Sequence, residues 1–247
     1  MALKFPQFFV AWLIIFALTL GGCTSGIESS NTSPMDKATE TVSKTISESI
    51  PGMKDLPRLE GKATVVMTVN GAPITMELDG TNAPITAGNF VDLVQKGVYD
   101  GLVFHRVVRD PQPFVAQGGD PQSKDPKFPA TRLGTGGYID PKTGTERRIP
   151  LEIKPKGANE PIYSQTITDK PELQHKQGSI AMARSQMPDS ASSQFYFALA
   201  DLSFLDGNYA VFGNVTEGFD VVNNIKQGDR IQSAKVTQGA ENLKNPQ

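Results

Sequence analysis

Two neighbouring segments, FHRVV at residues 104–108 and FVAQGGD at residues 114–120, indicate how this chain folds. Each is an apolar run of β-branched and aromatic residues, and the second stops at a Gly-Gly pair. One permanent cation, Arg106, and one amide, Gln117, are set into these runs. An unpaired buried guanidinium would be very costly. Arg106 therefore either reaches a partner at the protein surface or faces a cleft in which a ligand supplies the acceptor.

The residues before these segments are expected to open an antiparallel sheet. Residues 63–69 and 74–78 are rich in strand-forming residues, and residues 70–73 between them read Asn-Gly-Ala-Pro. Asn-Gly favours the positive φ angles of a tight turn, so the pattern predicts a hairpin. After Pro84 the apolar residues change to helical spacing, and Gly97 is placed to end the helix. The apolar stripe of this helix consists of Ile85, Phe90, Leu93 and Val94.

The second half of the chain continues the pattern of short strands. Strand-like runs lie at residues 179–183, 194–199, 209–215 and 231–237, and residues 218–226 have the spacing of a second helix. Many short strands with two separated helices and no strand-helix-strand alternation predict a mainly β fold. We expect a closed antiparallel barrel capped by two helices.

The stretch between these halves, residues 121–177, is expected to form mainly loop. It carries many Pro, Gly, Lys and Asp residues around one strand-like run at residues 149–153. The sequence Gly-Thr-Gly-Gly at residues 134–137 lacks the Lys-Ser/Thr ending and the preceding strand of a phosphate-binding loop. We interpret it as a flexible loop.

Composition allows one sizeable domain with appendages. The 247 residues are 38% hydrophobic, which is enough for a single core. A net charge of -2 provides no basic patch of the kind that nucleic-acid binding needs, so no nucleic-acid partner is expected.

The sequence offers little for covalent or metal catalysis. It has no Gly-x-Ser-x-Gly motif, and its single cysteine, Cys23, belongs to the N-terminal segment. Its two histidines, His105 and His175, are far apart and lack the spacing of metal ligands, so neither a metal nor a cofactor is expected. His105 should point to the opposite face of its strand from Arg106, as a hydrogen-bonded structural residue.

Five segments stand in the order found in the cyclophilins. They are FHRVV (104–108), FVAQGGD (114–120), GSIAMAR (178–184), SQFYF (193–197) and FLDGNYAVFG (204–213). Five ordered segments are far more specific than any short motif, and the chain resembles the cyclophilin-type peptidyl-prolyl isomerases over roughly residues 61–238. The resemblance implies a closed eight-stranded barrel with a helix at each end and an active groove on its outer face. It also implies cofactor-independent rotation of Xaa-Pro peptide bonds.

The same resemblance assigns roles to individual residues. Arg106 is expected to direct its guanidinium at the prolyl peptide, and Gln117 to orient both the substrate backbone and Arg106. Ala183 and Arg184 fall where the family binds the residues before proline, largely through main-chain groups. Taken singly, the apolar members of the site would fit a barrel core as well. The expected substrate-binding residues are Phe114, Val115, Ala183, Arg184, Gln194, Tyr196, Phe204, Leu205 and Tyr209.

Four departures from the best-known eukaryotic pattern fall at this site. Residues 107–113 make a longer turn, and Val115 stands where Met is common. Phe204 stands where many members carry a Trp that donates a hydrogen bond to cyclosporin, and Phe has no such donor. Tyr209 stands where those members have His. These changes bear on drug affinity more than on catalysis.

The N-terminal segment predicts export. Lys4 precedes an apolar run at residues 8–20, which is short of the ~20 residues needed to span a bilayer and is typical of a signal peptide. Leu-Gly-Gly-Cys at residues 20–23 resembles the bacterial lipoprotein cleavage box, in which the cysteine, here Cys23, becomes the lipidated N-terminus. An ordinary secretory signal and an uncleaved short anchor are the alternatives.

The predicted organisation has four parts: a signal peptide (1–22), a flexible tether (23–60), the isomerase domain (61–240) and a tail (241–247). The tether is rich in Ser, Thr, Glu, Lys and Pro and has few aromatic residues with which to bury a core.

These patterns predict an exported prolyl isomerase that acts as a monomer on proline-containing segments of unfolded or exported proteins. We expect a lipid anchor in a membrane, with the domain facing the periplasm or the cell exterior; a soluble protein of the periplasm or thylakoid lumen is the alternative. A module that binds proline segments, as a chaperone or in assembly, with little catalysis is the alternative function. A structural lipoprotein is a third hypothesis. Retention of Arg106 with Gln117 and Phe114 favours the enzyme, since a scaffold does not need a cation in an apolar groove.

Overall fold

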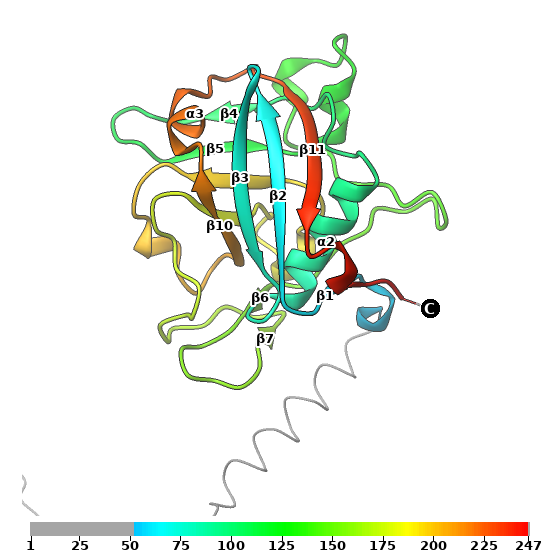
Figure 1. Ribbon diagram of the computed structural model, residues 1–247, viewed down its shortest axis with the longest axis vertical. Coiled ribbons are helices and arrows are strands. Elements are labelled where there is room, and N and C mark those ends of the chain that lie inside the picture. The colour runs from blue at the N-terminus through cyan, green and yellow to red at the C-terminus, as the bar shows by residue number, and fades with distance from the viewer. Residues whose placement is uncertain (1–51, 247) are drawn as a thin grey trace, which may run out of the picture.

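The computed structural model describes residues 52–246, which form one curled antiparallel sheet of eight strands with two helices (Figure 1). Neighbouring strands follow the order β11-β2-β3-β10-β8-β9-β5-β4. The strands of this sheet are β2 (Lys62–Val69), β3 (Ala72–Asp79), β4 (Arg106–Val107), β5 (Val115–Gly118), β8 (Ser179–Met182), β9 (Phe195–Ala198), β10 (Val211–Glu217) and β11 (Ile231–Gln238). Two small sheets pair β1 (Arg58–Leu59) with β12 (Leu243–Lys244) and β6 (Glu152–Ile153) with β7 (Ile162–Tyr163).

The sheet is open, so the prediction of a closed barrel is wrong. Within the described residues its edge strands, β11 and β4, do not pair with each other. They approach only through the residues before β4, where Val103 bridges Arg230 and the amide of Phe104 donates to the carbonyl of Asp229 (2.8 Å). Closure needs a continuous ladder, and β4 is only two residues long. The sheet therefore remains a strongly curled half-barrel, with β4 and β5 running across β2 and β3 in Figure 1.

The predicted hairpin is confirmed. β2 and β3 pair over their full lengths, and the chain reverses at Asn70 (φ 53°) and Gly71 (φ 77°). Alternate residues of both strands are buried, as the period-two pattern requires.

Both predicted helices are present as α2 (Pro84–Gln95) and α3 (Phe219–Asn224). Gly97 (φ 67°) ends the first helix as predicted, because its amide donates to the carbonyl of Val94 (3.0 Å). The apolar stripe of α2 is buried against the inner face of the curled sheet.

The inner core also determines which residues of β9 face outward. Phe90 of α2 packs against three rings, Tyr99 at 4.8 Å, Phe195 at 5.2 Å and Phe212 at 5.1 Å between centroids. Because side chains alternate along a strand, Tyr196 points to the opposite face. There it joins a second apolar cluster, which covers the outer face of the sheet. The buried members of that cluster are Val115, Ala181, Tyr196, Ala198, Leu202 and Val211.

The folded body extends beyond the range 61–240 at both ends. Met53 and Leu56 are buried in the main core. Leu59 of β1 lies opposite Leu243 of β12 and is also buried. The predicted signal peptide and Cys23, with most of the predicted tether, lie outside the described residues. None of the helices within residues 52–246 has the length and hydrophobicity of a membrane-spanning segment.

The long segment 121–177 is mostly irregular, as predicted, but it contributes one buried carboxylate to the fold. The helix α2 begins after Ala83, which has no side-chain acceptor for the first amides of the helix. Glu152 of β6 supplies the acceptors instead: the amides of Ile85 (3.1 Å) and Thr86 (2.7 Å) both donate to its carboxylate. A residue more than sixty positions away in sequence thus caps this helix.

Candidate active site

Arg106 and Gln117 lie side by side at one edge of the sheet. They are directly opposite each other in the β4–β5 pair, so their side chains share a face. Arg106 Nη1 donates to Gln117 Oε1 (3.3 Å), and the Arg106 side chain is exposed. The guanidinium carbon lies 5.4 Å from the centroid of the Phe114 ring. The cation therefore stands over an aromatic wall at the surface of the protein.

These residues border a hollow of ≈ 160 Å³ on the outer face of the sheet. It brings together all the predicted site residues except Gln194 and Phe204, from all five of the ordered segments of the chain. The lining residues are Arg106, Phe114, Val115, Gln117, Ala183, Arg184, Tyr196, Leu205 and Tyr209.

The other two predicted residues lie beside the hollow. Gln194 accepts a hydrogen bond from Gln117 Nε2 (3.1 Å) and donates to the carbonyl of Gly136 (2.7 Å). It also lines an adjoining cavity of ≈ 330 Å³, which Gln117, Ala183 and Arg184 share with the first hollow. Phe204 is 69% exposed and its ring stacks on Phe114, with centroids 6.1 Å apart. It therefore forms the rim rather than the wall.

The loop at residues 134–137 forms part of this second cavity and is anchored there. The carboxylate of the fully buried Asp120 accepts hydrogen bonds from the amides of Gly134 (2.6 Å) and Gly136 (3.3 Å). The Asp of the FVAQGGD segment thus ties this loop to the end of β5.

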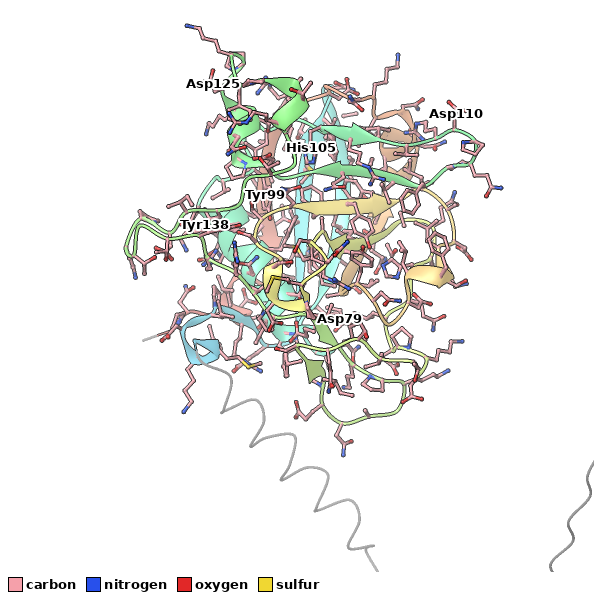
Figure 2. The ribbon with its side chains drawn as sticks, turned by 180° about the vertical axis from the view of Figure 1, so that it is seen from behind. Asp79, Tyr99, His105, Asp110, Asp125 and Tyr138 are labelled. Atoms are coloured by element: carbon pink, nitrogen blue, oxygen red, sulfur yellow. The ribbon has the colours of Figure 1, made fainter. Side chains whose placement is uncertain are left out.

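The longer turn before Phe114 is anchored at its base. The amide of Phe114 donates to the carbonyl of Val108 (3.0 Å), and Arg109 donates to the carbonyl of Ile225 after α3 (3.0 Å). Its tip, at Asp110, projects away from the sheet (Figure 2). The extra residues lengthen one rim without filling the hollow.

Arg184 has a role that the sequence did not predict. Its side chain donates twice to the carbonyl of Asn208 (2.9 and 2.6 Å), and its guanidinium lies 4.7 Å from the centroid of the Tyr209 ring. It therefore links the segment after β8 to the loop that carries Leu205 and Tyr209.

Two residues behind the hollow, the buried His175 and the partly exposed Asp206, were also missed. His175 Nε2 lies 2.9 Å from the Tyr196 hydroxyl, and His175 Nδ1 lies 2.8 Å from Asp206 Oδ1. Burial lowers the pKa of His175 and raises that of Tyr196. The only sequence signal was a histidine within a predicted loop, and nothing in its neighbourhood indicated Tyr196 as its partner.

The other histidine, His105, differs from the prediction of a hydrogen-bonded structural residue. Both of its ring nitrogens are buried, and neither meets a hydrogen-bond partner within residues 52–246. Burial also lowers the pKa of His105, which favours the neutral ring. Within the same residues no three His, Cys, Asp or Glu side chains converge as metal ligands.

Comparisons with known proteins agree on one family. The family model of the cyclophilin type peptidyl-prolyl cis-trans isomerases matches residues 64–243. A Synechocystis protein named as a thylakoid lumen peptidyl-prolyl cis-trans isomerase is 44% identical over 206 residues, which are 77% of this chain and 51% of that protein. A chloroplastic peptidyl-prolyl cis-trans isomerase of Arabidopsis thaliana is 38% identical over 216 residues, 78% of this chain and 46% of that protein. The chain thus spans about half the length of these relatives.

Solved structures give the same fold. The cyclophilin type peptidyl-prolyl cis-trans isomerase of Cryptosporidium parvum is 25% identical with a TM-score of 0.54, over 72% of this chain and 98% of its own. Its crystal structure in the presence of the dipeptide Ala-Pro has a TM-score of 0.53 at 25% identity, over 71% of this chain and 99% of its own. Because the family model covers most of its length, this chain belongs to the cyclophilin-type peptidyl-prolyl cis-trans isomerase family.

Proposed function

We propose that this protein accelerates the cis-trans rotation of Xaa-Pro peptide bonds in unfolded or exported proteins. The observation that carries the proposal is the position of the Arg106 guanidinium, beside Gln117 and over Phe114, at the edge of a hollow with both apolar and polar walls. A barrier of ~18–20 kcal/mol opposes this rotation because of amide resonance. No bond has to break for the barrier to fall, so a hydrogen-bond donor and a rigid pocket are sufficient.

In the proposed mechanism the hollow holds the proline ring while Arg106 acts on the peptide. Phe114, Val115, Tyr196 and Leu205 surround the ring. Arg106 donates to the imide nitrogen, which favours a pyramidal nitrogen without amide resonance. Gln117 orients the guanidinium through the hydrogen bond at 3.3 Å and positions the substrate backbone. Lys would be a poor replacement, because the planar guanidinium has fixed donor directions.

Two further observations support a peptide ligand. The adjoining ≈ 330 Å³ cavity shares Gln117, Ala183 and Arg184 with the hollow, so it could take the residues before proline. The Cryptosporidium relative was crystallised in the presence of Ala-Pro, the smallest ligand of the proposed class.

The test is a direct measurement of exchange. The full-length protein should accelerate the relaxation of an Xaa-Pro peptide, which takes ~10–100 s without a catalyst. Equal relaxation with and without the protein would contradict the isomerase proposal. Peptide binding without acceleration would favour the alternative of a segment-binding module.

Replacing Phe114 with alanine should weaken both peptide binding and rate. The substitution removes the wall under the Arg106 guanidinium and the ring on which Phe204 stacks, whereas the donor itself remains. Because the Phe114 ring contacts the substrate proline in the proposed mechanism, we expect KM to rise roughly tenfold without it, the equivalent of ~1.4 kcal/mol. The matched control is Phe128→Ala, since Phe128 also lies 5.4 Å beneath an arginine but does not line the hollow. An unchanged KM in the Phe114 variant would contradict the assigned wall.

We also propose that the protein is exported. The relatives named for the thylakoid lumen and the chloroplast, together with Lys4 and the apolar run at residues 8–20, support this proposal. A lipid anchor at Cys23 is the finer hypothesis. Acyl chains contribute ~0.8 kcal/mol per buried CH₂, so two or three of them would hold the protein at a bilayer.

Cys23→Ser should release the protein from membranes or block its processing, while isomerase activity stays unchanged. Mass spectrometry of the wild-type N-terminus measures the modification directly, and fractionation of cells measures its consequence. Ser25→Ala is a matched control two residues away and should stay lipidated. A wild-type N-terminus that is unmodified and lies beyond Cys23 would exclude the anchor and favour a soluble exported protein.

A further inference from the structure

A chain of three polar side chains, Asp206, His175 and Tyr196, runs through the protein behind the hollow. The distances are 2.8 Å from Asp206 Oδ1 to His175 Nδ1 and 2.9 Å from His175 Nε2 to the Tyr196 hydroxyl. His175 is 1% exposed and Tyr196 is 5% exposed. The contact between His175 and Tyr196 is therefore shielded from water, whereas Asp206 is partly exposed and the Tyr196 ring lines the hollow.

The partners determine where the proton of His175 lies. The Asp206 carboxylate can only accept, so Nδ1 carries the hydrogen and Nε2 is left with a lone pair. The Tyr196 hydroxyl must then donate to Nε2. An imidazolium would carry hydrogens on both nitrogens and could no longer accept from Tyr196.

His175 also holds the opposite wall of the hollow. Its backbone amide donates to Asp206 Oδ1 (2.8 Å), and its carbonyl accepts from the amide of Leu202 (2.9 Å). These bonds fasten the two ends of the turn at residues 202–206, which presents Leu205 to the hollow. One residue therefore connects the Tyr196 wall to the Leu205 wall.

We propose that His175 is a positioning residue whose neutral ring holds Tyr196 and the Leu205 turn around the substrate proline, and that its protonation weakens peptide binding. The inference rests on the proposed function, because it concerns how the same hollow holds its ligand. His175 acts through Tyr196 and does not line the hollow itself.

Burial and, to a lesser extent, the charged groups around His175 set the pH at which its ring becomes protonated. Asp206 is the charged group in contact with its ring, and Tyr209 and Arg184 lie beyond Tyr196. The next residue, Lys176, pairs with Asp201 at the surface (2.9 Å). Burial lowers the pKa of His175 from 6.5, although Asp206 opposes the shift. The neutral ring therefore predominates at neutral pH, and the loss of binding should begin below pH 6.5.

The experiment measures KM and kcat for an Xaa-Pro peptide without titratable side chains, from about pH 7.5 to about pH 5. The wild-type KM should rise roughly three- to tenfold in acid, as expected when the buried hydroxyl hydrogen of Tyr196 loses its acceptor, while kcat changes less. His175→Gln places an amide near the Nε2 position that can accept without titrating, so it should keep the neutral-pH KM and lose the acid dependence. Tyr196→Phe should start from a higher KM and show little further rise.

Control variants make the outcome decisive. His105 is the other histidine of the chain, so His105→Gln should retain the acid dependence. The proposal is overturned if the acid dependence of KM survives in His175→Gln, disappears in His105→Gln or is absent from the wild type. Nitrogen NMR of the wild type tests it without any variant, because His175 Nε2 must be unprotonated at neutral pH and titrate below pH 6.5.

Failure of the proposed function would give a different result. If the wild type binds the peptide without accelerating its exchange, binding titrations over the same pH range take the place of KM. They then test the role of His175 independently of catalysis. Absence of both binding and acceleration would overturn both proposals.

Discussion

Arg106→Ala is expected to slow catalysed exchange about 10²–10³-fold, the size of effect seen when one preorganised donor is removed from an active site. The reason is that the substitution removes the only guanidinium directed at the imide nitrogen in the proposed mechanism. The fold should be unaffected, because Arg106 is exposed and its bond to Gln117 is long, at 3.3 Å. Exchange rates on an Xaa-Pro peptide, with thermal unfolding as the stability measurement, test both expectations.

Two further variants refine this prediction: one separates the donor geometry of Arg106 from its charge, and the other is a control. Arg106→Lys keeps the charge but loses the planar donor pair, so most of the rate should still be lost. Arg132→Ala removes another exposed arginine that lies 5.4 Å over a phenylalanine ring, Phe128, outside the hollow. It should keep the wild-type rate. Wild-type activity in Arg106→Ala would exclude this residue from the mechanism.

The second large effect concerns stability. Glu152→Ala is expected to lower the free energy of unfolding by about 2–4 kcal/mol, since each buried donor that is left without an acceptor costs ~1–3 kcal/mol and the costs do not add fully. The carboxylate accepts from the amides of Ile85 and Thr86 and from the Thr86 hydroxyl (2.7 Å), and it is 1% exposed. Removing it leaves the first turn of α2 without acceptors. Denaturant unfolding measures the loss.

The matched controls use the same residue type. Glu160 is exposed in the same long segment, so Glu160→Ala should change stability by less than about 0.5 kcal/mol. Glu152→Gln keeps one acceptor oxygen and should lose less than the alanine variant. Equal unfolding midpoints for wild type and Glu152→Ala would contradict the capping role.

The pH dependence of stability adds a check on Glu152. Burial raises its pKa, although the hydrogen bonds from Thr86 and Ile85 oppose the shift. A carboxyl group with a raised pKa in the folded state penalises folding once it ionises. Its contribution is most favourable below the unfolded pKa near 4.3 and declines as pH rises through the folded value. Glu152→Gln cannot ionise, so this decline should be absent from its stability curve.

Most elements could be predicted because their signals are local. The period of two in residues 63–69, the Asn70-Gly71 turn and the helical stripe ending before Gly97 each act over a few residues, and the structure has all three. The pairing of Arg106 with Gln117 is nearly local as well, because one short turn joins their strands.

What the sequence could not predict concerns contacts between distant segments. Whether the sheet closes depends on how residues 101–107 meet residues 228–231, and an isolated bridge with four backbone hydrogen bonds forms there in place of a ladder between β4 and β11. The extent of the folded body depends on Leu59 meeting Leu243, at opposite ends of the domain. Neither contact can be predicted from the sequence of one of its segments alone.

Local patterns in the sequence were enough to predict the main strands, the hairpin, the two helices and the ordered segments that place this chain among the cyclophilins. The open sheet, the capping of α2 by Glu152 and the position of His175 behind Tyr196 follow from the packing of distant segments. The physical reason is that backbone propensity and hydrophobic period act over neighbouring residues, whereas a buried polar group is stable only with a partner. Which partner it meets depends on how distant segments pack, and packing is a property of the whole fold.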